Sequence, residues 1–157
     1  SNQYLSINSR DDTKVYLGVH NGLHVGSDVF FNKVKTISPV AKIGDTPYYS
    51  LAAAVEAAQA GETITLIDNV EASEVILLGK SLTINGNGYK VTSNATRVFR
   101  VTTANTKVTL NDVNMVSRTV MVYPNDIRGI SIDAGLQNVV LTLNNCSVDF
   151  TDATACD

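Results

Sequence analysis

The side chains best suited to chemistry lie in the segment between residues 122 and 133. It contains two carboxylates and a guanidinium, at Asp126, Arg128 and Asp133. Clustered carboxylates can hold a calcium ion beside a polysaccharide while an Arg removes a proton, and two neighbouring Asp side chains can act as acid and base. This segment is therefore the first place to look for an active site.

These carboxylates do not, however, make up a recognisable active site. Asp112 stands in a turn rich in Asn, where Asp commonly serves the turn itself, and Asp149 lies apart from the others. We predict no catalytic residues, no metal ligands and no cofactor. A long loop on one face of a protein usually carries its binding surface, so we expect binding here instead. The residues expected to bind are Tyr123, Asn125, Asp126, Arg128 and Asp133.

The His and Cys residues do not form a pattern typical of a metal site. His20 and His24 flank an Asn-Gly turn, and across such a hairpin this spacing is more often coincidence than a metal site. Cys146 and Cys156 do not have the spacing of a metal-binding pair. Two interpretations stay open for them: unpaired thiols with Cys146 packed as a small apolar residue, or a disulfide that pins the C-terminal end.

Composition limits the classes of partner. The 157 residues suit one domain, and a net charge of −3 with scattered basic residues argues against nucleic acid. No apolar run is long enough to cross a bilayer, so we expect no membrane insertion, and the first residues do not resemble a signal peptide. The last residues stop without a closing element, so we interpret the chain as a piece of a longer protein. The oligomeric state stays open.

The elements that would position these residues fall into two regions. Residues 1–40 form the first, a leading segment of strands in which Asn21-Gly22 between two apolar runs predicts a hairpin. Residues 41–157 begin with a helix over residues 51–60, with Ser50 as its N-cap and Gly61 as its stop. Its apolar stripe, which should cover a neighbouring element, consists of Leu51, Ala54, Val55 and Ala58.

After the helix, one pattern recurs four times: apolar residue, Thr, apolar residue, then a turn rich in Asn, Asp and Gly. When the second apolar positions are aligned, the repeats step by 18, 26 and 33 residues, through Leu66, Ile84, Leu110 and Leu143. Secondary apolar runs lie between the repeats, at residues 75–78, 98–101 and 129–132. Constant strands joined by loops of varying length are typical of a solenoid, in which strands keep register while loops lengthen outside.

The pattern predicts an all-β fold: a short right-handed parallel β-helix, with the helix capping its first coil. Asn85, Asn111 and Asn144 occupy equivalent positions and should form a ladder of amide hydrogen bonds. A β-sandwich would explain the alternation equally well but not the repeated turn. The Thr positions 65, 83, 109 and 142 should form one outward line, but one Thr per coil at unequal spacing disfavours an ice-binding surface.

Residues 41–116 resemble the opening of pectin-lyase-like β-helix domains of secreted or wall-attached bacterial surface proteins. Residues 117–157 resemble it loosely and residues 1–40 not at all. The matching residues are Ile43-Gly44-Asp45, Tyr48 or Tyr49, Ser50-Leu51, Ala57-Ala58, Gly61, Thr63–Leu66 and Asn85–Tyr89.

The resemblance implies a protein that is secreted or on the cell surface. We expect a non-enzymatic display module that binds a glycan or a host surface protein, as an adhesin does. The alternative is a fragment of a polysaccharide lyase or glycoside hydrolase whose catalytic coils lie outside this chain. The fold hosts many functions, so fold alone does not decide between the two.

Overall fold

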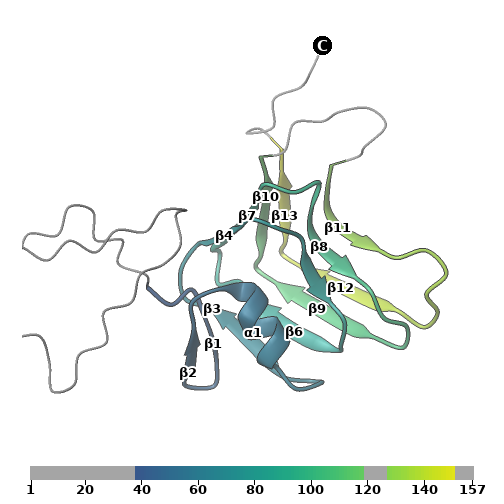
Figure 1. Cartoon of the computed structure of the whole chain (residues 1–157), viewed down its shortest axis with the longest axis horizontal. Helices are drawn as coiled ribbons and strands as arrows, with labels where there is room; N and C mark the ends of the chain where they lie inside the picture. Colours follow the sequence, from purple (N-terminus) through teal and green to yellow (C-terminus); the bar gives the residue numbers. More distant parts are fainter. Residues whose placement is uncertain (1–37, 119–126, 151–157) are drawn as a thin grey trace, which may run out of the picture. The chain divides into compact units, whose positions relative to one another are not determined.

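The computed structural model describes residues 38–118 and 127–150, which form one helix and three sheets (Figure 1). The predicted hairpin around Asn21-Gly22, together with His20 and His24, lies outside the described residues.

The first sheet has six strands in the order β12-β9-β6-β3-β1-β2. Strands β3, β6, β9 and β12 carry the repeated pattern and pair in parallel, whereas β1 pairs antiparallel with both β2 and β3. Their bounds are β1 Ala41–Ile43, β2 Thr46–Tyr48, β3 Thr63–Leu66, β6 Leu82–Asn85, β9 Lys107–Asn111 and β12 Val140–Asn144. The hairpin of β1 and β2, which the sequence analysis did not predict, extends this sheet beyond β3.

The other two sheets are wholly parallel and are interleaved with the first along the chain. The second has the order β13-β10-β7-β4, and the third has the order β11-β8-β5. The second contains β4 Val70–Ala72, β7 Lys90–Ser93, β10 Asn114–Ser117 and β13 Ser147–Asp149. The third contains β5 Ile76–Leu78, β8 Arg97–Val101 and β11 Arg128–Ile132, which lie within or overlap the predicted secondary runs.

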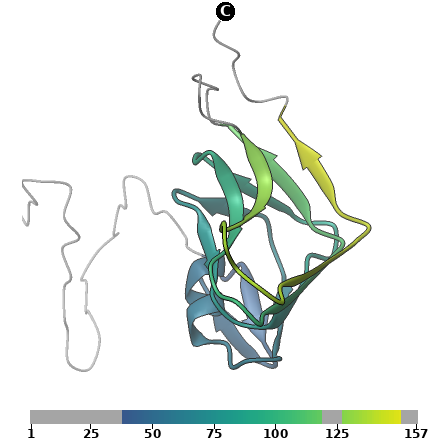
Figure 2. The same cartoon turned by 90° about the vertical axis from the view of Figure 1, so that its right-hand side faces the viewer.

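From β3 to β10 each strand therefore pairs in parallel with the third strand further along the chain. The chain visits the three sheets in turn and then begins again one strand further on (Figure 2). The structure is thus mostly β, with parallel sheets and one helix, as the repeated pattern predicted at this level.

The first step of the predicted alignment is wrong. Ile64, not Leu66, pairs with Ile84, so this step is two residues longer than predicted. The later steps hold, since Ile84 pairs with Leu110 and Leu110 with Leu143. A shift of two residues keeps every side chain on its face, so the apolar alternation could not distinguish the two registers. The line of Thr residues accordingly starts at Thr63 rather than Thr65.

Helix α1 (Leu51–Ala57) begins where the sequence predicted but ends three residues early. Ser50 Oγ accepts a hydrogen bond from the Ala53 amide at 3.1 Å, which satisfies one of the open donors of the first turn. The chain becomes extended at Ala58, with ψ 139°. The Lys80 ammonium donates to the carbonyl oxygens of Glu56 and Ala58 at 2.9 and 2.8 Å, so a distant Lys, not Gly61, satisfies the end of the helix.

The apolar interior is built from columns of side chains in register across the sheets. Ile64, Ile84 and Leu110 form one column and are fully buried, while Leu143, the next in line on β12, is 45% exposed. Each fully buried Leu or Ile contributes roughly 1.5–3 kcal/mol. Helix α1 contacts β1, β4 and β5, and all four residues of its predicted apolar stripe are buried.

Candidate functional site

The segment predicted to bind is only partly described. Tyr123, Asn125 and Asp126 lie outside the described residues. Arg128 is the first residue of β11, and Asp133 follows its last residue. The two residues are five positions apart along an extended strand, so their Cα atoms lie roughly 16 Å from each other. Arg128 and Asp133 therefore do not lie side by side as an acid and base acting on one bond would have to.

The Asp133 carboxylate joins two neighbouring strands. Its Oδ1 accepts a hydrogen bond from Nε of Arg100 at 2.5 Å, and its Oδ2 accepts one from Nη2 at 3.1 Å. The guanidinium therefore binds the carboxylate through two parallel hydrogen bonds. Arg100 belongs to β8, the strand beside β11. The hydrogen bonding of the Arg100 guanidinium to Asp133, and then the negative charge of Asp133, raise the pKa of Arg100. The pair links β8 to its neighbour β11.

Asp112 stabilises the turn in which it stands, as predicted from the sequence. It has a positive φ of 51°, a conformation that Asp and Asn tolerate better than most residues. Its Oδ1 accepts from Nδ2 of Asn145 at 2.6 Å, and its carbonyl accepts from the Gly88 amide at 2.9 Å. The carboxylate thus connects the turn after β9 to the equivalent turn after β12.

The three asparagines expected to stack lie in one row, here called the Asn row: Asn85, Asn111 and Asn144. Nδ2 of Asn111 donates to Oδ1 of Asn85 at 2.8 Å, and Nδ2 of Asn144 donates to Oδ1 of Asn111 at 2.7 Å. Each residue ends its strand, so the row follows the edge where the first sheet turns into the second. On β3, Thr65 pairs with Asn85 and so takes the equivalent position.

A second amide contact of the same kind, not predicted from the sequence, joins Asn105 and Asn138. Nδ2 of Asn138 donates to Oδ1 of Asn105 at 2.9 Å, and both residues have φ 56°. Each stands in the turn that precedes a strand of the first sheet. An Asn shortly before each of the last two repeats was the available signal.

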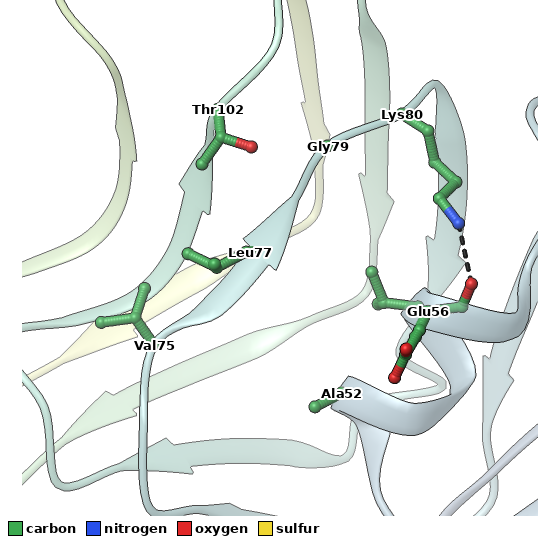
Figure 3. A pocket seen from close by; sticks show the side chains of 8 residues that line it. Ala52, Glu56, Val75, Leu77, Gly79, Lys80 and Thr102 are labelled. Carbon is green, nitrogen blue, oxygen red and sulfur yellow. Dashed lines mark hydrogen bonds between the residues drawn. The ribbon is translucent and has the colours of Figure 1, made fainter.

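Two hollows of similar size open on the described surface. One, of about 440 Å³, lies between α1 and β5 and is lined mainly by apolar side chains (Figure 3). The other, of about 420 Å³, follows the turns beside the Asn row and is lined by Asp112, three Asn residues, Gly88, Cys146 and Ser147. Neither was predicted, because each gathers residues that are far apart in sequence.

The cysteines and the acidic side chains do not form a metal site in the described residues. Cys146 is half-buried, and its thiol lies 3.3 Å from the carbonyl oxygen of Leu110, while Cys156 lies outside the described residues. In the described part of the chain, no three His, Cys, Asp or Glu side chains are grouped so that they could hold a metal ion.

No helix within residues 38–118 and 127–150 has the length and apolar character needed to span a membrane.

Comparison of the chain with protein-family models, with curated proteins and with solved structures found no match.

Proposed function

We propose that residues 41–157 form a short right-handed parallel β-helix of the pectin-lyase-like kind, with α1 covering its first coil. The recurring strand order supports this, because β3, β6, β9 and β12 follow one another in parallel with two other strands between each pair. The right-handed sense follows from the rule for crossover connections between parallel strands. The Asn row supports it too, since amide ladders stabilise stacked parallel strands.

The module serves, in this proposal, as a non-enzymatic display element of a secreted or wall-anchored bacterial surface protein. The observation that carries the proposal is that these polar side chains bind neighbouring strands and turns. The carboxylates of Asp133 and Asp112, which the sequence offers for chemistry, hold the coils together through Arg100 and Asn145. Polar groups engaged in stacking make a stiff scaffold, and a stiff scaffold suits display.

Binding of a glycan or a host surface protein is the activity we propose for the module. Arg128, exposed at the start of β11, is one of the residues that the sequence predicts to bind. The positive charge of its guanidinium attracts the carboxylate groups of acidic sugars or proteins. Acidic glycans are therefore the first ligands to test.

A glycan array combined with a turnover assay tests the proposal. The chain should bind one or more acidic glycans and release no unsaturated uronate from polygalacturonate, with or without calcium. Arg128→Ala should weaken binding at least about tenfold, whereas Lys90→Ala, which removes an exposed cation on β7, should not. Turnover by the purified chain would instead favour a fragment of a polysaccharide lyase or hydrolase.

A further inference from the structure

The groove between α1 and β5 has the form of a site for an extended peptide. Ala52, Val55 and Glu56 of the helix form one wall, and Val75 and Leu77 of the strand segment form the other. Figure 3 shows Leu77 and Val75 on one side and the helix with Ala52 and Glu56 on the other. A helix facing the free edge of a sheet across an apolar groove is an arrangement that suits peptide binding by strand addition.

Among the described residues no strand pairs with this edge of β5, and α1 lies across the groove from it. The third sheet ends at β5, whereas the first sheet continues past β3 to β1. The Thr102 amide donates to the Leu78 carbonyl at 3.2 Å, so the backbone of Leu78 faces β8. Backbone groups alternate in direction along a strand, so the amide and carbonyl of Leu77 face away from β8, toward the open edge. They are ready to pair with another strand.

The side chains at this edge favour an apolar partner. Leu77 is 55% exposed, the second most exposed large apolar side chain in the described residues, while its neighbours Ile76 and Leu78 are buried. Gly79, which follows the strand, lines the groove without a side chain of its own. An extended segment with alternating apolar side chains would cover Leu77 and complete the edge.

Charges at the two ends of β5 give the groove a direction. Glu74 precedes the strand and lines an adjoining hollow, and Lys80 follows the strand. The Lys80 ammonium uses two of its donors on helix carbonyls, which leaves a third for a ligand. A partner running parallel to β5 would bring its start to Glu74 and its end to Lys80. Charge complementarity therefore favours a basic start and an acidic end.

We propose that this groove binds an extended peptide, which adds to β5 as a fourth parallel strand of the third sheet. The peptide has a basic residue before, and a carboxylate after, an alternating apolar centre. Parallel addition continues the existing order β11-β8-β5, in which every pair is already parallel. The Leu77 backbone supplies the hydrogen bonds, and the groove walls select the apolar side chains.

A synthetic peptide with one Trp tests this directly, because the chain itself contains no Trp. The probe has Lys at its start, alternating Val and Thr around a central Trp, and a free C-terminal Asp. Its fluorescence should change saturably with a dissociation constant below about 1 mM. A copy N-methylated at the amides that face β5 should bind at least about tenfold more weakly, because it cannot donate to the strand edge.

Ala52→Phe should obstruct the groove and weaken binding at least about tenfold. Ala53→Phe is the matched control, since Ala53 is an exposed neighbour on the same helix that does not line the groove. The proposal is overturned if no saturable change appears up to about 1 mM, or if the N-methylated copy binds equally well. It is also overturned if the chain alone sediments as a dimer that Ala52→Phe dissociates, because a second copy would then occupy the edge.

Discussion

Nδ2 of Asn144 donates a hydrogen bond to Oδ1 of Asn111 at 2.7 Å, although the two residues are 33 positions apart in the sequence. Asn111 in turn donates to Asn85, 26 positions earlier. Connections of quite different length therefore return the chain to the same place on neighbouring parallel strands. Hydrogen bonds between equivalent side chains fix the register of the stack as well as stabilising it.

Replacement of the central residue of the Asn row should be costly. Asn111→Ala removes two hydrogen bonds, each worth about 0.5–1.5 kcal/mol net, so we expect a loss of about 1–3 kcal/mol in the free energy of unfolding. Urea denaturation followed by circular dichroism measures this loss. Asn94→Ala, at an exposed turn position, is the control and should change stability by less than about 0.5 kcal/mol. Equal stability of the two variants would remove the Asn row from the stabilising contacts.

A charge introduced into the apolar column should unfold the chain at a buried position but not at an exposed position in register with it. Leu110→Asp places a carboxylate at a fully buried site and should unfold the chain, with a loss above about 4 kcal/mol. Leu143→Asp is the matched control, because Leu143 pairs with Leu110 but is 45% exposed. Thermal denaturation should show a cooperative transition for Leu143→Asp and none for Leu110→Asp. A cooperative transition in both would place Leu110 outside the core.

Gly86 is required where two turns approach closely. A Cβ at this position would meet the carbonyl oxygen of Asp112, a backbone atom that has no room to move aside. Gly86→Ala should therefore destabilise the chain by about 3 kcal/mol or more. Gly79→Ala, whose added Cβ would make only ordinary contacts, should be neutral or slightly stabilising. Similar melting temperatures for the two variants would contradict the close approach of these turns.

The sequence predicted the parts of the fold that repeat. The apolar–Thr–apolar pattern located β3, β6, β9 and β12, and the turn that follows it located the three residues of the Asn row. Ser50 marked the start of α1 because its capping bond is local. Each of these signals depends on residues close together in the sequence, or on spacing that recurs.

Features that depend on distant partners could not be predicted. Helix α1 ends early where Lys80 binds its carbonyl groups, and nothing near Ala58 in the sequence indicates this. Arg100 gave no sign that it would hold Asp133. Nor could the sequence show how far apart Arg128 and Asp133 stand, because they are close in the sequence but lie at opposite ends of an extended strand.

The proposed β-helix depends most directly on the position of β3 beside β6, in parallel and with Thr63 next to Thr83. Neighbouring residues on adjacent strands have Cα atoms about 5 Å apart, within the range that a disulfide bridges. Two residues further along the strand, Thr65 should lie about 8 Å from Thr83, beyond that range. The register from the sequence alone would have paired Thr65 with Thr83.

Disulfide formation in two double variants, made with Cys146 and Cys156 replaced by Ser, is therefore the decisive measurement. Under mild oxidation, mass spectrometry and thiol counting should show a bridge in nearly all molecules of Thr63→Cys/Thr83→Cys and in few of Thr65→Cys/Thr83→Cys. The reverse result would restore the shorter first step of the sequence alignment. A bridge in neither variant would contradict the parallel stack itself.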